Sequence, residues 1–115
     1  MSDKEKDLVR LHHIAEALNS IFEFTIEIDK AAFLKSDLIQ SAVVRKLEII
    51  GEAVTALSDT TKEAANAIPW HKIKGLRNIL IHEYFKVDAA QIWETIEFDL
   101  PSFKIQIEEL IDNLK

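Results

Sequence analysis

The chain has 115 residues, 48% hydrophobic and 30% charged, and a formal net charge of −6. This length predicts one domain over residues 1–115 that buries roughly two-thirds of its unfolded surface. The absence of cysteine excludes disulfides, a thiol nucleophile and a thiolate metal site. The first residues are charged and no apolar run nears the ~20 residues that span a bilayer, so we expect a soluble cytoplasmic protein without a membrane partner. The acidic balance confines any nucleic-acid binding to a local basic patch.

The N-terminal part of the chain predicts one long helix. Ser2 with Glu5 forms a capping box that would open it. Its apolar seam alternates spacings of three and four residues: Leu8, Leu11, Ala15, Leu18, Phe22 and Thr25. Residues 22–28 also alternate with a period of two, which is a strand signal. We favour helix because the seam runs through these residues and no second strand is available for pairing.

A second helix is predicted to begin after Ser36, a candidate N-cap. Its apolar stripe consists of Ile39, Val43, Leu47, Ile50, Val54 and Leu57. Gly51 inside this helix costs about 1 kcal/mol relative to alanine, a cost that close approach of a neighbouring backbone would justify. Thr60 with Glu63 then predicts a short helical turn that reaches Ala67.

The last half of the chain predicts two more helices. Ile68-Pro69-Trp70 would begin the third helix, which ends near Phe85, because proline in a first turn needs no N–H. Asp88 with Gln91 would begin the last one. Its apolar positions keep their spacing across Pro101: Trp93, Ile96, Leu100, Phe103, Ile107, Leu110 and Leu114. We therefore expect an all-α bundle of four to five helices, in which the last one is either split into two coaxial segments or kinked at Pro101.

The candidate chemistry is concentrated in residues 77–84, which read RNILIHEY. Arg77 provides a planar, permanently charged fork for phosphate. His82 can exchange a proton near neutral pH, which typically contributes about 10²- to 10⁴-fold in rate. Without acidic metal ligands nearby, the pair suits metal-independent phosphodiester cleavage, and we expect neither metal nor cofactor. On spacing alone, a surface ion pair for Arg77 and a structural role for His82 are the commoner alternatives.

Helix geometry separates these two residues. Five residues at 100° each place Arg77 and His82 about 140° apart. Lys74 and Tyr84 lie on the Arg77 side, whereas Asn78 lies on the His82 side. The two side chains can converge only if they flank a cleft lined by another helix, or if the helix loosens near His82. We expect a cleft shared between two copies of the chain, which a two-fold dimer would supply.

Two further features of the sequence could support such a cleft. Arg45 and Glu48 share a helix face and could orient Arg77 or His82, although an ion-pair ladder on a solvated face is an equally good explanation. Gly75 aligns with His82 and would permit close approach of a partner.

The remaining histidines and the tryptophans have plainer explanations. His12, His13 and His71 have no ligand spacing to nearby acids, so we expect them on the surface. Trp70 and Trp93 are more readily explained as core or interface anchors than as platforms for base stacking.

The segment Arg77-x4-His82-x-Tyr84 is the Arg-x4-His-x-Tyr motif of HepT-like proteins, which belong to the HEPN (higher eukaryotes and prokaryotes nucleotide-binding) superfamily. The similarity extends over roughly residues 38–112. Its other blocks are residues 44–53 (VRKLEIIGEA), 68–70 (IPW), 75–78 (GLRN), 87–94 and 99–101 (DLP).

The resemblance implies an α-helical HEPN-type homodimer with the motif at the subunit interface. It further implies the toxin half of a toxin–antitoxin pair, a metal-independent endoribonuclease that acts on tRNA or mRNA. By position, Arg77 and His82 would be the catalytic pair. Tyr84 would be the residue that a partner nucleotidyltransferase of the MntA type modifies with AMP, which silences the toxin.

One alternative belongs to a different functional class. The chain could be a non-catalytic subunit that presents Tyr84, or a bound nucleotide, to a nucleotidyltransferase. The acidic net charge slightly favours this alternative.

Overall fold

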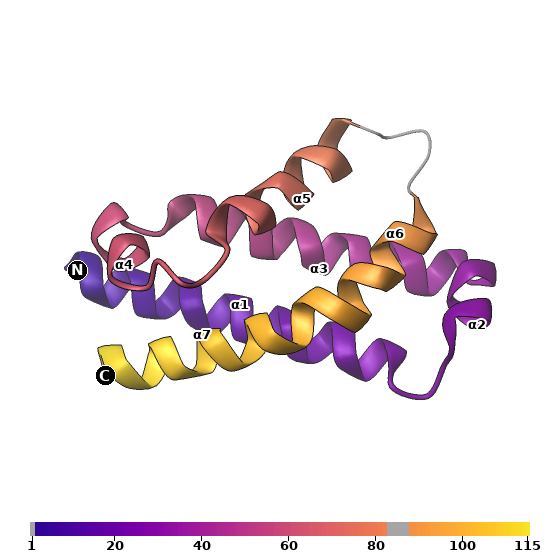
Figure 1. The fold of residues 1–115 in the computed structure, drawn as a ribbon, viewed down its shortest axis with the longest axis horizontal. Helices are drawn as coiled ribbons and strands as arrows, with labels where there is room; N and C mark the ends of the chain where they lie inside the picture. Colours follow the sequence, from indigo (N-terminus) through magenta and orange to yellow (C-terminus); the bar gives the residue numbers. More distant parts are fainter. Residues whose placement is uncertain (1, 83–87) are drawn as a thin grey trace.

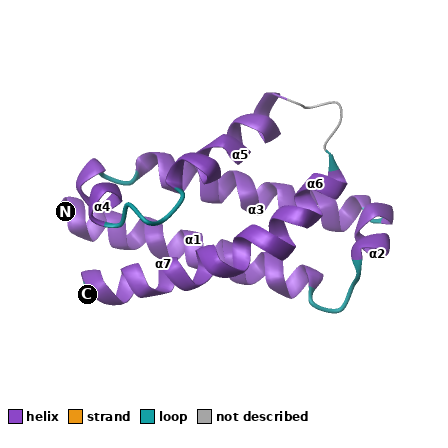
Figure 2. Cartoon of the chain, viewed as in Figure 1, coloured by secondary structure: helices purple, strands orange, loops and turns teal. Residues whose placement is uncertain are grey.

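The structure, a computed structural model, describes residues 2–82 and 88–115, and of residues 77–82 it describes the backbone alone. Helices make up these ranges apart from short loops, and the ranges contain no strand (Figures 1 and 2). The helices are α1 (Asp3–Thr25), α2 (Lys30–Lys35), α3 (Asp37–Ala56), α4 (Asp59–Ala64), α5 (Trp70–His82), α6 (Ala89–Glu94), the π-helical segment η1 (Thr95–Asp99) and α7 (Leu100–Leu114). The prediction of an all-α fold is confirmed for this part of the chain.

The long helices form one bundle. Helix α1 packs against both α3 and α7, and α5 packs against α3. Both chain ends lie at one end of the bundle beside α4, while α2 lies at the opposite end (Figure 1). None of the described helices is long and apolar enough to cross a membrane.

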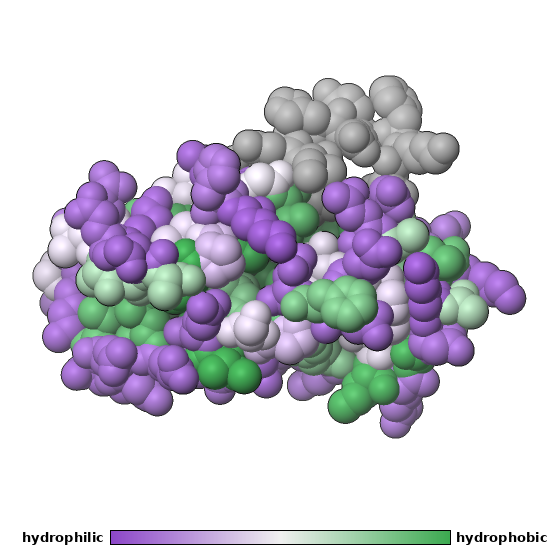
Figure 3. Space-filling view, in the orientation of Figure 1, coloured by the Kyte–Doolittle hydropathy of each residue, from purple (hydrophilic) through white to green (hydrophobic). Residues whose placement is uncertain are grey.

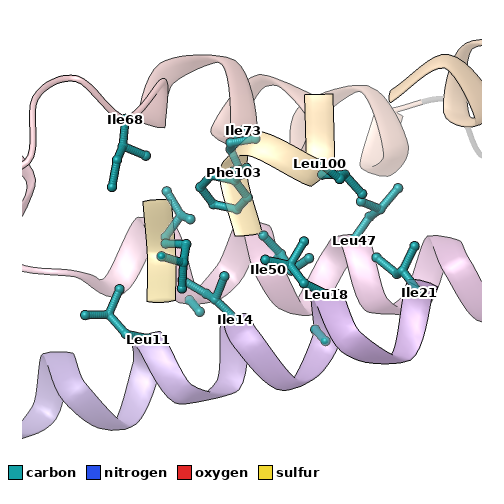
Figure 4. Close-up of a cluster of buried hydrophobic side chains, with 14 of the residues drawn as sticks. Leu11, Ile14, Leu18, Ile21, Leu47, Ile50, Ile68, Ile73, Leu100 and Phe103 are labelled. Carbon is teal, nitrogen blue, oxygen red and sulfur yellow. The ribbon is translucent and has the colours of Figure 1, made fainter. Parts of the chain in front are cut away.

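The core is one contiguous set of aliphatic and aromatic side chains from all the long helices. Leu18 on α1 and Leu100 at the start of α7 are fully buried, and Ile50 on α3 almost so. These side chains point toward one another in Figure 4, with Phe103 and Ile73 on the side of α5. Each buried leucine or isoleucine contributes about 1.5–3 kcal/mol to the free energy of unfolding.

The predicted seam of α1 is only partly correct. Leu11, Leu18 and Thr25 are buried, but Leu8, Ala15 and Phe22 are half-buried. Ile14 and Ile21 are fully buried in their stead. The reason is that α1 contacts α3 and α7 together, so its buried face is wider than a seam against one partner.

Local side-chain chemistry sets most helix boundaries. The three predicted N-caps accept hydrogen bonds from the backbone N–H three residues on: Ser2 from Glu5 at 3.2 Å, Ser36 from Ile39 at 3.1 Å and Asp88 from Gln91 at 3.1 Å. The preference for helix over strand is confirmed up to Thr25, where α1 ends.

The predicted start of the short helix was wrong. Helix α4 is capped by Ser58, whose Oγ accepts from Thr61 N–H at 3.3 Å, and it ends at Ala64. Ser58 takes this role because its backbone and hydroxyl are also held by Asp7.

Pro101 explains the π-helical segment before it. In a regular α-helix the proline ring would collide with the carbonyl of Glu97 and could not donate to it. The chain widens instead, so that Leu100 N–H donates to the Thr95 carbonyl, five residues back. Ile96 and Leu100 both stay buried, while Phe98 between them is turned outward. The last helix is thus split as the sequence suggested, through a π turn.

Candidate functional site

Helix α5 carries the first part of the sequence motif. Its first turn follows Pro69, whose carbonyl accepts from Ile73 N–H at 3.2 Å. Ile73 is buried against the core, and Lys74 beside it is exposed. The helix is therefore anchored at its start and presents at least one cation to solvent.

The predicted site residues follow on the same helix. Arg77, Asn78 and His82 occupy the last part of α5, and the regular helix through position 82 agrees with the angular separation expected for Arg77 and His82. Their side chains, and Tyr84 altogether, lie outside the described part of the chain. The catalytic and modification roles of these residues stay predictions.

Arg45 and Glu48 form the ion pair that their spacing suggested, at 3.4 Å. The Arg45 side chain is 62% exposed, so the pair contributes little to stability. Both residues line a shallow hollow of about 270 Å³ on α3. An orienting role toward Arg77 or His82 stays a prediction.

Part of the local positive charge is already paired within the chain. Lys72 on α5 donates to the Asp99 carboxylate at 2.9 Å, which joins the start of α5 to the end of η1. Lys74, two residues nearer the motif, makes no such bond with any described residue. Lys74 is therefore the better candidate to meet a phosphate.

A groove of about 420 Å³ runs between α5 and the α6–η1 segment. It is lined by Lys72, Gly75, Leu76, Gln91, Glu94, Thr95, Phe98 and Asp99. A Cβ atom built on Gly75 would meet nothing within 4 Å. The groove is thus open along the α5 face that bears Gly75.

The other histidines and both tryptophans are where the sequence placed them. His12, His13 and His71 are exposed. Trp93 packs on Phe33 with ring centroids 5.3 Å apart, and Trp70 meets Phe103 edge-on at 6.3 Å. The Trp70 indole N–H also donates to the Ala65 carbonyl at 3.1 Å, a typical arrangement for a half-buried anchor. The described residues contain no group of three histidine or acidic side chains that could hold a metal ion.

Asp7 on α1 is a buried carboxylate that the sequence analysis missed, with only 2% of its surface exposed. It accepts from the Ser58 backbone at 3.0 Å, from the Ser58 hydroxyl and from the Thr61 hydroxyl at 2.6 Å. Burial alone raises the pKa of Asp7, but these hydrogen bonds, with Arg10 nearby, bring it below its ordinary value of 3.8. Asp7 fastens the start of α1 to the α3–α4 loop, so its role is structural.

Phe98 is the second residue that the sequence analysis missed. The sequence did contain a signal for it, because Phe98 lies outside the apolar stripe of the last helix. An aromatic residue off the core stripe is expected to face solvent, and Phe98 is 72% exposed.

Fold and motif together define a class of protein: a small all-helical bundle that carries Arg-x4-His on the helix before its long C-terminal segment. Comparison with known proteins makes this specific. The family described as "Ribonuclease HepT-like" matches residues 14–110. The chain belongs to the HepT-like ribonuclease family.

Individual relatives agree. A "Probable ribonuclease HepT" of Thermococcus cleftensis is 44% identical over 100 residues, which cover 87% of this chain and 91% of that protein. A Methanocaldococcus jannaschii protein named as a candidate RNase is 41% identical over 98 residues, 85% of this chain and 90% of its own. A third relative, from Caldanaerobacter subterraneus and also named as a candidate RNase, is 39% identical over 105 residues. These residues cover 91% of this chain and 94% of that protein. No solved structure matches the chain significantly.

Proposed function

We propose that this protein is a metal-independent endoribonuclease that acts on tRNA or mRNA as the toxin of a toxin–antitoxin system. The observation that carries the proposal is the match to the HepT-like ribonuclease family over residues 14–110, together with the intact Arg77-x4-His82 spacing. A short arginine–histidine spacing alone would be weak support. The family match over most of the chain makes it specific.

The residue types suit cleavage by the neighbouring ribose hydroxyl. His82 would take the proton from a 2′-hydroxyl as its oxygen attacks the adjacent phosphorus and the bond to the 5′-oxygen breaks. The leaving oxygen then receives a proton from a second histidine or from water. Arg77 would hold the phosphate oxygens as negative charge develops on them.

A homodimer would complete this site. Positions 77 and 82 lie about 140° apart on a regular helix, so a cleft that both positions flank suits a shared phosphate better than one helix face does. Two copies related by a two-fold axis that pack α5 near its own mate would form a cleft lined from both sides. We therefore propose a dimer, to be checked by light scattering of the purified protein.

Replacing either catalytic candidate tests the proposal. We expect Arg77→Ala and His82→Ala each to reduce RNA cleavage by a factor of about 10² or more, because each removes a group that acts in the transition state. The readout is cleavage of total and transfer RNA by purified protein in EDTA, with circular dichroism to show that the fold persists.

His71→Ala is the matched control. His71 is an exposed histidine in the first turn of the same helix, so this variant should cleave like the wild type. Full activity in His82→Ala would refute the assignment. Loss of wild-type activity in EDTA would refute metal independence.

Tyr84 offers a way to silence the enzyme. AMP attached there by a MntA-type nucleotidyltransferase, acting as antitoxin, would bring a phosphate and a base close to the Arg77 and Lys74 face of α5. Charge-assisted hydrogen bonds of about 1.5–3 kcal/mol each could then hold that phosphate where substrate would bind. Because Tyr84 is the only tyrosine in the chain, modification of a tyrosine can occur nowhere else.

Mass spectrometry of the chain expressed with its cognate nucleotidyltransferase tests this switch. We expect a mass gain of one or more AMP groups, absent from Tyr84→Phe, and we expect Tyr84→Phe to stay toxic in the presence of the partner. Normal silencing of Tyr84→Phe would rule out the tyrosine switch and leave RNA cleavage unaffected as a proposal.

A non-catalytic nucleotide-binding or nucleotidyltransferase-binding subunit is the second candidate. The net charge of −6 favours it, because an acidic surface repels phosphate-rich substrates away from the few cations near the motif. Growth arrest on expression of the chain alone, abolished by His82→Ala, would decide for the ribonuclease. Harmless expression and no RNA cleavage would decide for the subunit.

A further inference from the structure

We propose that the groove between α5 and the α6–η1 segment binds one unstacked RNA base beside the cleavage site, and that it prefers bases with an exocyclic amino group over uracil. Phe98 would supply the stacking surface, and Glu94 with Asp99 would accept hydrogen bonds from the base. This inference rests on the proposed ribonuclease function and names a subsite for its substrate.

The shape of the groove suits a small flat ligand. Its volume of about 420 Å³ falls within the range of small-molecule sites. One wall belongs to α5 and the other to α6 and η1, two segments that run past each other in the upper part of Figure 1. Gly75 leaves the α5 wall without a side chain, so a ring could lie directly against the backbone.

Phe98 is the aromatic wall of the groove. It is 72% exposed, whereas the other phenylalanine of this C-terminal segment, Phe103, is buried in the core. Phe98 lies within the π turn at Thr95–Asp99, and such turns occur frequently at functional sites. Hydrophilic residues cover most of the face shown in Figure 3, with smaller apolar areas between them. A single exposed aromatic ring is ordinary on such a surface, so what distinguishes Phe98 is its place in the groove lining. Every base has a face that can stack on such a ring.

The polar groups of the groove favour hydrogen-bond donors on the ligand. Glu94 makes no ion pair with any described residue, and Asp99 has only Lys72 as its partner there. Carboxylates accept from base amino groups, as from the N4 amino group of cytosine. Uracil has no amino group, so we expect it to bind least well.

The charge of the groove argues against a phosphate as its occupant. Two carboxylates outnumber the single lysine, which is already paired at 2.9 Å. A phosphate would instead meet Lys74 on the Arg77 side of α5. Position 82 follows position 75 by almost two turns on the same side of the helix, about 10.5 Å along its axis. A base in the groove would thus belong to a nucleotide near the cleaved one.

Binding of short single-stranded RNA tests the inference. The probes are fluorescent oligouridylates that carry one central adenine, cytosine, guanine or uracil, measured by anisotropy with wild type and with Phe98→Ala, Glu94→Gln and Phe24→Ala. Phe24 is an exposed phenylalanine on α1 that lies outside the groove, so Phe24→Ala is the matched control.

We expect Phe98→Ala to weaken binding roughly 5- to 150-fold, the range measured for lost base–aromatic stacking. Glu94→Gln should reduce the preference for amino-bearing bases over uracil, because the amide replaces a carboxylate acceptor with a group that can also donate to uracil carbonyls. Phe24→Ala should bind like the wild type. These three results together support the base subsite.

Two results would overturn it. One is unchanged affinity and base preference in Phe98→Ala. The other is a Phe98→Ala variant that loses self-association by light scattering, which would make Phe98 an interface residue between copies. Failure of the proposed function is separate: wild type that neither binds nor cleaves any RNA refutes both, whereas wild type that cleaves RNA with no effect of Phe98→Ala refutes the subsite alone.

Discussion

At the scale of single residues, Asp7 shows how one buried carboxylate can organise a helical end. It receives three hydrogen bonds from Ser58 and Thr61, residues more than fifty positions away in the chain. A buried charge is costly unless such donors surround it. The same Ser58 caps α4, so the hydrogen bonds of Asp7 hold the start of α1 and the start of α4 together.

We expect Asp7→Asn to lower the free energy of unfolding by about 2 kcal/mol at pH 7, because an amide cannot accept from all three donors. The folded-state pKa of Asp7 is below its ordinary value of 3.8. Its contribution is therefore fully present above about pH 3.8 and is lost as pH falls further, through the folded-state pKa. Urea unfolding at fixed protein concentration should show a constant difference in the free energy of unfolding between wild type and Asp7→Asn from pH 7 to 5, and this difference should shrink below about pH 4.

Glu16→Ala is the control, because Glu16 is an exposed acid on the same helix. A difference between wild type and Asp7→Asn that grows with acidity would contradict the prediction.

At the scale of helices, α5 combines a buried side with an open groove. Ile73 faces the core, while Gly75 lines the groove. A Cβ atom added at Gly75 would have no neighbour within 4 Å. Glycine in a helix interior costs about 1 kcal/mol relative to alanine. Packing within the described chain does not require this glycine, so its role is expected to involve a ligand or a partner.

Gly75→Ala should therefore raise the free energy of unfolding by about 1 kcal/mol and weaken binding of the adenine-containing oligouridylate. Thermal unfolding and the anisotropy assay measure the two effects. Gly51→Ala is the contrast, because Gly51 is buried in α3, where we expect an added methyl group to disturb the packing. A loss of stability in Gly75→Ala together with a smaller dimer fraction would point instead to close packing of two copies at this position.

At the scale of the whole molecule, the charge distribution limits how RNA can bind. The chain carries a net charge of −6, and Lys72 is neutralised by Asp99. Only a few cations near the motif are therefore available for phosphates. Such a surface should bind RNA through a few local contacts at the site and not along an extended stretch of the RNA backbone.

The salt dependence of RNA binding should accordingly be shallow. With one or two cations from each of two copies, we expect log K to fall with log salt at a slope between about −1 and −3, at roughly −0.7 per phosphate contacted. Anisotropy titrations between low and physiological salt provide the slope. A slope steeper than about −6 would mean that the protein binds RNA along an extended basic surface.

Much of the fold and the position of the candidate site could be predicted from local patterns. The helix caps at Ser2, Ser36 and Asp88 depend on contacts three residues apart, and such contacts are visible in the sequence. The motif on α5 was placed by the same periodicity. The buried face of α1 and the start of α4 were predicted less well, because each depends on elements far away in the chain.

The sequence by itself determined the helical class, the helix that carries Arg77 and His82, and membership in a ribonuclease family, since periodicity and motif spacing are local properties. Only the tertiary structure decided that Asp7 is buried beneath Ser58, that Lys72 is paired with Asp99, and that Phe98 lines a groove opposite Gly75. These are contacts between segments distant in the chain, and packing alone brings such segments together.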